Sequence, residues 1–299
     1  MNKIIYKIFV ILFLFITILL AYLSIVGINT NKFNNRIIDK VKNIDKNLDI
    51  ELQKVNILLD IFSFNLKIKT IGTNLIYDKK SIQLANLKST ISIRSLINNN
   101  FSITNLKIST KTIKIDDLIS FIRLFKNDTK LYIAEKLVKN GFIVADIDIE
   151  FDTEGKIKDN YFINGFVKNG KINFSKKNNL SKISFTFDIK KNYFDLQNIK
   201  ISLNDNYLFI PELLTKKNKD NYLINGKINN ERVKLSQNNI NLINKKNPKL
   251  NIQKLEFASK NSFSFEVNKK FKIDNLQIDS NIDLKNLFLL NENKILTKV

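Results

Sequence analysis

The 299-residue chain contains no histidine, no cysteine and no tryptophan, and it has only 7 glycines and 2 prolines. The absence of histidine excludes a Ser-His-Asp triad, an imidazole acid–base step and histidine metal ligands. The absence of cysteine excludes a thiolate nucleophile, a zinc ribbon, an iron–sulfur cluster and a disulfide. No glycine-rich phosphate-binding loop occurs either. Most catalytic and cofactor chemistry is therefore excluded before any motif is considered.

The charge of the chain is strongly positive, with 49 Lys plus Arg against 28 Asp plus Glu, giving 49 − 28 = +21. Only Arg36, Arg94, Arg123 and Arg232 are arginines, so 49 − 4 = 45 are lysines. A surface that reads phosphates favours the bidentate arginine fork, with aromatic side chains interleaved for base stacking. Here the lysines are spread between apolar residues. We interpret the charge as a solvated face and expect no nucleic-acid partner.

A long apolar run near the N-terminus predicts a membrane anchor. The run from Ile8 to Ile28 carries no charge, and as a helix it would be about 31 Å long, close to the ~30 Å hydrocarbon core of a bilayer. A cleaved signal peptide would have a shorter apolar stretch, of about 7–15 residues, and small residues before the cut. Residues 1–32 are therefore predicted to form a short tail and a single uncleaved transmembrane anchor. Its anchor residues include Ile8, Phe15, Leu20 and Ile28.

Three segments have the apolar spacing of helices. Residues 33–48 are predicted to form an amphipathic helix with Asn34 or Asn35 as its cap. Asp116 or Asp117 is predicted to cap a second helix, and a third is predicted to end at Asn140-Gly141. Asn169-Gly170 and Gly155 are interpreted as turns.

Nearly all of residues 49–299 alternates between apolar and polar side chains. The apolar positions from Ile143 to Phe151 share one predicted face, while Asp146, Asp148 and Glu150 share the other. Such period-two alternation predicts half-buried strands. The fold class is therefore mainly β with a few short helices: a transmembrane helix followed by an elongated, twisted, bulged antiparallel sheet curved into a groove.

A recurring pattern supplies the bulges: apolar, x, apolar, x, x, apolar, x, apolar. The doubled polar pairs are Thr104-Asn105, Gln197-Asn198, Gln253-Lys254 and Asp274-Asn275, and a weaker copy runs from Ile82 to Leu87. A β-bulge at each pair would keep the apolar residues on both sides of it facing the same interior. The apolar positions of the four copies are our candidates for lipid contact: Phe101, Ile103, Leu106, Ile108, Phe194, Leu196, Ile199, Ile201, Leu250, Ile252, Leu255, Phe257, Phe271, Ile273, Leu276 and Ile278.

An internal repeat lies within the predicted sheet. Residues 158–175 align without gaps on residues 219–236, at an offset of 219 − 158 = 61 residues. Repeated supersecondary units that bury their apolar face against neighbours form stacked, quasi-linear structures. We expect each unit to contain several strands. The glycines of Asn164-Gly165 and Asn225-Gly226 are predicted to mark bulges or close backbone approaches.

The richest acidic cluster runs from Asp146 to Glu154 on the polar face of a predicted strand. Alternating carboxylates could bind Ca²⁺ or supply two acids for glycoside hydrolysis, but no ligand loop or other polar constellation accompanies them. We interpret the cluster as a solvated outer face. The protein is therefore predicted not to be an enzyme, with no catalytic residue, no metal site and no cofactor.

An anchored sheet with one apolar face and no catalytic constellation favours lipid as the ligand, since apolar area removed from water is worth roughly 25 cal/mol per Å². The chain also resembles the AsmA-like family of repeating β-groove, bridge-like lipid-transfer proteins, which includes TamB- and YhdP-type members. The residues that carry the resemblance are the anchor, the segment Asn34–Leu48, LKIKTIGTNLIY, SIQLANLKSTISIRSLINNNFSITNLKIS, YFINGFVKNGKINF and YFDLQNIKISLN.

This resemblance implies a bacterial inner-membrane protein with a cytoplasmic N-terminus, a periplasmic body and membrane phospholipids as its ligand. It also implies a role in lipid supply to the outer membrane. The family has no catalytic residues to carry over. The alternative hypothesis is a non-catalytic scaffold for envelope assembly, whose sheet edges pair with other envelope proteins.

Overall fold

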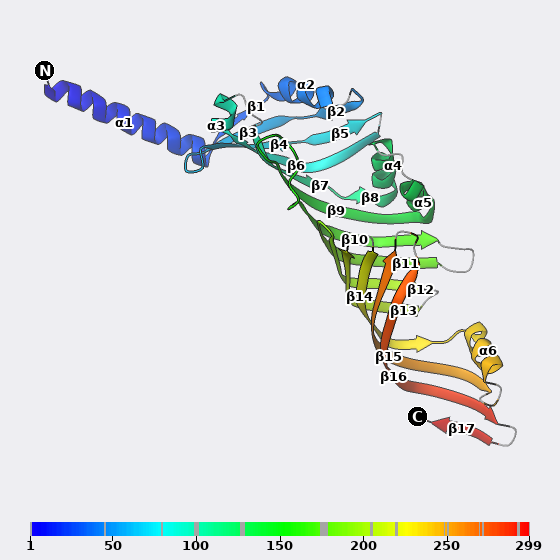
Figure 1. Ribbon diagram of the computed structural model, residues 1–299. Coiled ribbons are helices and arrows are strands. Elements are labelled where there is room, and N and C mark those ends of the chain that lie inside the picture. The colour runs from blue at the N-terminus through cyan, green and yellow to red at the C-terminus, as the bar shows by residue number, and fades with distance from the viewer. Residues whose placement is uncertain are drawn as a thin grey trace. The chain divides into compact units, whose positions relative to one another are not determined.

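A computed structural model of the chain describes residues 2–44, 46–78, 80–98, 102–125, 129–173, 179–203, 206–218, 221–247, 249, 251–268, 270, 272–291 and 294–298. It confirms the predicted class, since antiparallel strands dominate and the helices are few (Figure 1). The chain forms two compact units. Unit 1 comprises Met1–Ile113, Asp117–Tyr132 and Val144–Asn164, and unit 2 comprises Lys114–Asp116, Ile133–Ile143 and Gly165–Val299.

The first part of the chain alternates between helices and strands. Its elements are α1 (Asn2–Ile25), β1 (Ile28–Thr30), α2 (Asn34–Ile44), β2 (Leu48–Glu51), β3 (Lys54–Asp60), β4 (Asn65–Ile71), β5 (Thr73–Tyr77), β6 (Lys80–Ser92), α3 (Ile93–Ile97), β7 (Ile103–Thr110), β8 (Ile113–Lys114), α4 (Ile115–Phe125), α5 (Thr129–Leu137) and β9 (Val138–Glu150). In unit 1, β6 pairs with β5 over its first half and with β4 over its second half. Strand β3 joins β1 to β4, and β7 joins β6 to β9.

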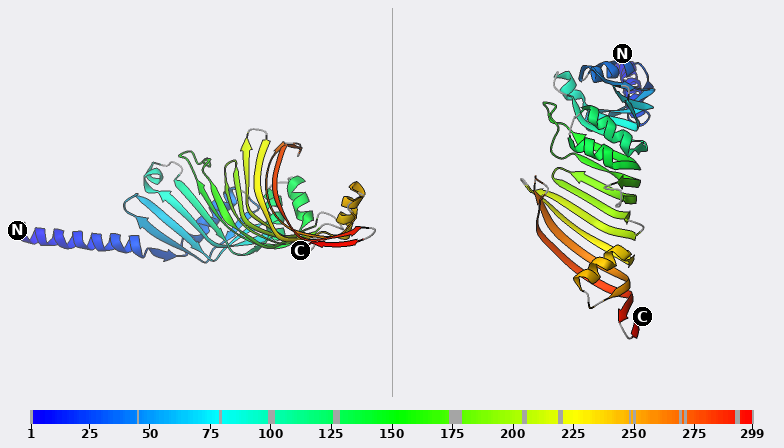
Figure 2. Two further views of the ribbon diagram at one scale, coloured as in Figure 1. Left: turned by 90° about the horizontal axis from the view of Figure 1, so that it is seen from below. Right: turned by 90° about the vertical axis from the view of Figure 1, so that its right-hand side faces the viewer.

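Unit 2 is a meander of long strands. Its elements are β10 (Phe162–Asn173), β11 (Asn179–Lys190), β12 (Tyr193–Leu203), β13 (Asn206–Asn218), β14 (Asn221–Lys234), α6 (Gln237–Lys246), β15 (Ile252–Asn268), β16 (Ile273–Asn291) and β17 (Lys294–Lys298). From β11 to β17, each strand pairs antiparallel with the next. These strands curve strongly along their length (Figure 2).

Helix α6 is held against the start of β15 by two hydrogen bonds, and both elements bury an isoleucine. The Asn244 side-chain amide donates to the Ile252 carbonyl oxygen, and its Oδ1 accepts from the Ile252 N–H, both over 2.8 Å. This pair of bonds imitates a strand ladder and satisfies backbone groups at the start of β15. Ile240 and Ile252, only 2% and 5% exposed, are buried at the same place.

The two copies of the repeat become equivalent strands. Residues 158–175 contain β10 and residues 219–236 contain β14. One repeat period therefore spans the four strands from β10 to β13. This confirms the prediction that the repeated sequence unit contains several strands.

The anchor prediction extended too far along the chain. The helix that is long and apolar enough to span a membrane covers Ile4–Ile25, and Ile28 is instead the first residue of β1. Gly27, with φ 72°, ends the helix in the left-handed region that glycine adopts without a Cβ penalty. The domain boundary predicted at residue 32 therefore falls after β1. Ile8, Phe15 and Leu20 lie on α1 as predicted.

Several other local predictions differ from the structure. Helix α2 ends at Ile44, before the predicted residue 48, and α4 begins at Ile115, so that Asp116 lies in its first turn, where its charge complements the helix dipole. Helix α5 ends at Leu137, and Gly141 lies inside β9. Gly170 is likewise inside β10, not in a turn. A Cβ on Gly141 would lie 2.9 Å from the Gly170 Cα, so these glycines serve close backbone approach.

Candidate functional site: the apolar face of the sheet

One row of apolar side chains crosses six strands of unit 2. Opposed residues of an antiparallel pair project to the same side of the sheet. The register therefore places the following residues in one row on one face, from β11 to β16: Phe187, Leu196, Leu213, Gly226, Phe263 and Ile278. We call this side of unit 2 the apolar face, and the opposite side the polar face.

The bulges predicted from the doubled pairs are present. Register shifts fall at Thr104 in β7, at Asn198 in β12, at Gln253 in β15 and at Asn275 in β16. The weaker copy has its shift at Ala85 in β6. Asn198 and Asn275 have φ of 53° and 55°, a conformation that asparagine tolerates better than most residues. Without a bulge, the doubled polar pair would turn the following apolar residues to the opposite face. The extra residue in the bulge reverses this, so the apolar side chains before and after it share one face.

The structure brings the candidates within each unit onto one face. In unit 1, Ile103, Leu106 and Ile108 lie opposite Ile91, Ser89 and Leu87 of β6. In unit 2, the described candidates of β12, β15 and β16 all lie on the apolar face. Phe101, Leu250 and Phe271 lie outside the described residues.

The candidates differ in exposure. Ile199 and Ile252 are buried, and most others on β7, β12 and β15 are half-buried. On β16, however, five apolar-face side chains are 55–62% exposed: Ile273, Leu276, Ile278, Ile282 and Leu284. We call these five residues the β16 strip. It extends about 35 Å along the strand, at roughly 3.3 Å per residue.

A glycine makes room for an aromatic ring in the middle of the apolar face. A Cβ on Gly226 would lie 2.5 Å from the Phe263 Cζ and 3.0 Å from the Leu213 Cδ1. The Phe263 ring therefore lies over the β14 backbone, and its ring stacks on Phe265 with centroids 5.8 Å apart. Asn225-Gly226 was predicted to mark a bulge or a close backbone approach, and the atoms that approach Gly226 are instead those of side chains.

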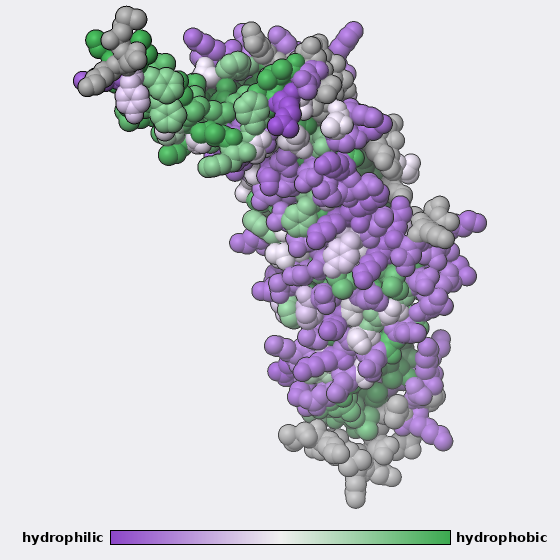
Figure 3. All heavy atoms as spheres, turned by 60° about the vertical axis from the view of Figure 1, so that its left-hand side comes forward, coloured by the Kyte–Doolittle hydropathy of each residue, from purple (hydrophilic) through white to green (hydrophobic). Residues whose placement is uncertain are grey.

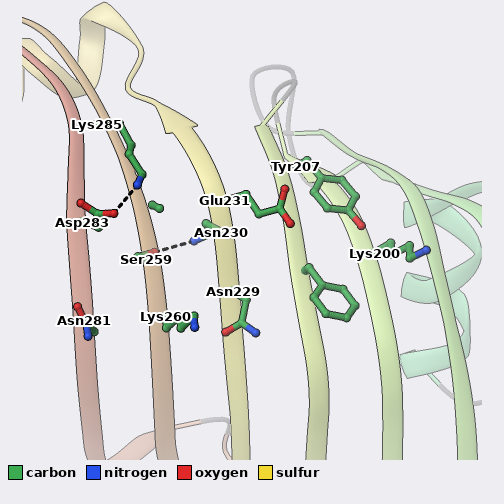
Figure 4. Close-up of a pocket in the computed structure, with 12 residues that line it drawn as sticks. Lys200, Tyr207, Asn229, Asn230, Glu231, Ser259, Lys260, Asn281, Asp283 and Lys285 are labelled. Carbon is green, nitrogen blue, oxygen red and sulfur yellow. Dashed lines mark hydrogen bonds and ion pairs between the residues drawn. The ribbon is translucent and has the colours of Figure 1, made fainter. Parts of the chain in front are cut away.

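A hollow of about 870 Å³ in unit 2 is lined mainly by residues of the polar face. The row Lys200, Phe209, Asn229, Lys260 and Asn281 crosses it from β12 to β16. Figure 4 shows these strands with Asp283 paired to Lys285 and Asn230 bonded to Ser259. None of the predicted lipid-contacting residues lines this hollow.

Polar side chains also gather over the strands on the face shown in Figure 3, whereas apolar ones cover α1. In unit 1 the ladder Asn56, Lys69, Lys88, Lys107 and Asp148 crosses from β3 to β9. Lys107 Nζ lies 2.6 Å from an Asp148 carboxylate oxygen, which lowers the pKa of Asp148 even though burial opposes this shift. These lysines form a solvated face on one side of the strands, as predicted from the sequence.

A buried carboxylate lies among three cations on the polar face of unit 2. The Glu256 side chain is 1% exposed, and its Oε2 accepts from the Arg232 Nε over 2.9 Å. Lys254 and Lys234 approach its Oε1 at 3.2 Å and 4.0 Å. The hydrogen bonds from Arg232, with those from Lys254, hold the pKa of Glu256 below its ordinary value against the effect of burial.

The acidic cluster of β9 is occupied by local partners. Asp148 and Glu150 pair with Lys107 and Lys158. Asp152 Oδ1 accepts from the backbone N–H groups of Glu154 and Lys156, which closes the turn that contains Gly155. Among the described residues, no group of acidic side chains is arranged to hold a metal ion.

Sequence reasoning missed part of the apolar face. Phe187, Leu213 and Phe263 share the row of Leu196 and Ile278 but lie outside the doubled-pair motif. Simple alternation along β11 and β15 was the signal that could have added Phe187 and Phe263. Leu213 was harder to find, because β13 changes register relative to β14 between Phe209 and Leu213.

The chain matches no family model, no curated protein and no solved structure. Inferences about its function therefore rest on the apolar helix α1, the apolar face and the polar partners of its charged residues.

Proposed function

We propose that the protein is a membrane-anchored, non-catalytic lipid-binding protein that shields phospholipid acyl chains on its apolar face. Helix α1 would hold it in the bilayer. The observation that carries the proposal is the β16 strip, in which five large apolar side chains are each more than half exposed on one side of one strand. Ser280 lies between Ile278 and Ile282 on the same side of the strand. Soluble monomers rarely leave this many large apolar side chains together in water unless a ligand or partner covers them.

The chemistry of the face suits acyl chains. Every Å² of apolar surface removed from water contributes roughly 25 cal/mol, so a chain lying along the β16 strip would be retained by contact area alone. Across the row from Phe187 to Ile278, the side chains offer no hydrogen-bond donor or acceptor. Such a lining holds acyl chains without choosing among headgroups, and the headgroups stay in water.

The resemblance to AsmA-like proteins supports the same proposal and adds a location. On this proposal α1 would lie in the bacterial inner membrane, with the N-terminus in the cytoplasm and the body in the periplasm. There, the protein would contribute to lipid supply to the outer membrane.

Photo-crosslinking tests the proposal in cells. A photoreactive amino acid is placed at Ile103, Ile201 or Ile278, and crosslinked lipid is identified by mass spectrometry after purification in mild detergent. The matched controls are Lys200 and Gln277, which neighbour Ile201 and Ile278 but project to the polar face. Lipid adducts at the apolar positions and none at the controls are expected. Equal labelling on both faces, or no copurified phospholipid, would refute lipid binding by this face.

A second candidate function is an assembly scaffold, which one observation favours. Strand β17 pairs with β16 only over Leu287–Asn291, so that, within the described residues, the β16 edge from Ile273 to Asn286 has no strand partner beyond β15. Unpaired edges accept strands from other proteins. This function predicts crosslinks to protein, not lipid, at positions along this edge.

A further inference from the structure

The tip of the β3–β4 hairpin is a second apolar element at the anchored end of unit 1. The tip comprises Ile61, Phe62, Ser63 and Phe64. Phe62 is fully exposed, and Ile61 and Phe64 are 41% and 48% exposed. A hairpin tip is usually polar because it faces water. Three large apolar side chains at one tip therefore indicate another environment.

The register places this tip beside the end of α1. Strand β1 runs away from α1, and Ile28 and Thr30 oppose Ile57 and Val55. Because the pair is antiparallel, β3 runs back toward the helix, and Asp60 lies about 10 Å beyond Ile57 in that direction. The chain from α1 to β1 contains only Val26 and Gly27. The tip is thus held at a fixed position near the last turn of α1 (Figure 1).

Further apolar residues surround the tip. Ile25 and Val26, at the end of α1, are exposed, and so is Ile97 of α3. Helix α3 reaches the tip because its first residue, Ile93, donates its backbone N–H to the Phe64 carbonyl oxygen. Arg94, the residue after Ile93, is exposed and basic, whereas the exposed Lys67 is paired with Asp60. Exposed apolar side chains beside a basic residue suit a surface of acyl chains and anionic headgroups.

We propose that the Ile61–Phe64 tip inserts into the interface of the bilayer that α1 spans. This inference rests on the anchoring part of the proposed function, not on lipid binding by the apolar face. Continuity with α1 identifies the bilayer as the occupant, since a helix exposed along its apolar length leaves the lipid surface beside Ile25 and Val26. The tip and α1 together fix unit 1 to the membrane at two points, which restrains its rotation about the anchor.

The depth of insertion is limited because charged and polar groups of the turn must stay in contact with water. Asp60 Oδ1 accepts from the Ser63 N–H, and the Asp60 carboxylate pairs with Lys67 over 2.8 Å. These charges lie directly behind the tip, and irregular backbone is not tolerated in the hydrocarbon centre. The phenyl rings therefore reach the boundary between headgroups and acyl chains, and Asp60 stays in water.

The absence of tryptophan makes a direct test available, since Phe62→Trp creates the only indole in the chain. The full-length variant is placed in nanodiscs, one copy per disc, with lipids brominated near the ester end of the acyl chain. Emission is expected to shift to the blue and to lose most of its intensity. Phe15→Trp in α1 is the positive control, quenched by bromines near the methyl end. Phe166→Trp, an exposed position of β10 in unit 2, is the negative control.

The outcomes separate the possible failures. Quenching at Phe15 without quenching at Phe62 overturns the insertion and leaves the anchor in place. A blue shift at Phe62 without quenching shows that the protein itself covers the tip, and it also overturns the inference. Absence of quenching at both positions refutes anchoring itself, whereas lipid binding by the apolar face is read separately by crosslinking. If Phe62→Trp does not fold, a nitroxide on Ser63→Cys, the only cysteine, gives the depth by paramagnetic resonance.

Discussion

Gly27 lies so close to Ile57 that a Cβ atom on Gly27 would be 2.4 Å from the Ile57 carbonyl oxygen. Gly27 also has φ 72°, which L side chains rarely adopt. These two constraints fix the joint between α1 and β3. At this joint α1 therefore meets the sheet with no room for a side chain on residue 27.

Gly27→Ala is expected to destabilise this joint by about 1–3 kcal/mol, because alanine meets both backbone strain and a steric clash. The loss should appear as faster hydrogen exchange in β1, with little change in β15. Gly155→Ala is the control, since Gly155 also has positive φ, of 84°, but lies in a turn away from the joint. Equal effects of the two substitutions would show that strain alone, not the contact with Ile57, accounts for the loss.

Asp60 predicts a pH dependence of the hairpin. The hydrogen bond from Lys67, with those from Ser63, lowers the pKa of Asp60 from 3.8 to about 2. Because the folded pKa is the lower one, the stabilising contribution is complete above pH 3.8 and is lost as the pH falls toward 2. Carboxyl carbon resonances should show an Asp60 midpoint near 2, and Lys67→Met should raise it. A midpoint at or above the ordinary value would contradict the pairing.

The cations around Glu256 predict unequal effects of removing either partner. Glu256→Gln leaves Arg232, Lys254 and Lys234 close together without their carboxylate, so it should lower the urea midpoint more than Arg232→Gln does. After Arg232→Gln, Lys254 still lies 3.2 Å from the carboxylate. Since the folded pKa of Glu256 is lowered, its contribution should be present above its ordinary pKa of 4.5 and be lost as the pH falls through the lower, folded value. The reverse order of midpoints would contradict a carboxylate-centred cluster.

Gly226 predicts a test of packing on the apolar face. A Cβ at this position would meet the Phe263 ring at 2.5 Å, so Gly226→Ala should cost about 1–3 kcal/mol through forced movement of the ring. Gly170→Ala is the milder control, because its Cβ would meet the Ile183 Cβ at 3.1 Å. Urea unfolding should rank the two in this order. Equal losses would indicate that moving the Phe263 ring costs no more than relieving the milder contact at Gly170.

The sequence predicted features that depend on the alternation of apolar and polar residues within one strand. It missed features that depend on contacts between residues far apart in the sequence. The bulges at Asn198 and Asn275 could be predicted because an extra polar residue within one strand breaks its own alternation. The strand positions of Gly141 and Gly170 could not, since a local Asn-Gly pair looks the same in a turn and beside a closely approaching backbone.

The same dependence on contacts between strands explains why two other features of unit 2 were not predicted. The ion pair of Arg232 with Glu256 joins residues on β14 and β15, and only the register brings them together. The hollow lined by Asn229 and Lys260 was not predicted for a related reason, since residues of several strands line it together. The sequence pattern defines which side chains share a face, but it does not define which way the face bends.

The β16 strip offers a test of the proposed lipid binding that should leave the free energy of unfolding nearly unchanged. Leu276→Asp with Ile278→Asp should alter the free energy of unfolding by no more than about 0.5 kcal/mol per site, because both side chains are more than half exposed. The same change should remove most copurified phospholipid, since each charge would have to be desolvated beside an acyl chain. The control, Gln277→Asp with Asn281→Asp, adds the same charge to the polar face of the same strand. Loss of lipid from both pairs would mean that net charge, not the apolar face, governs binding. Retention by Leu276→Asp with Ile278→Asp would exclude the β16 strip as the lipid site.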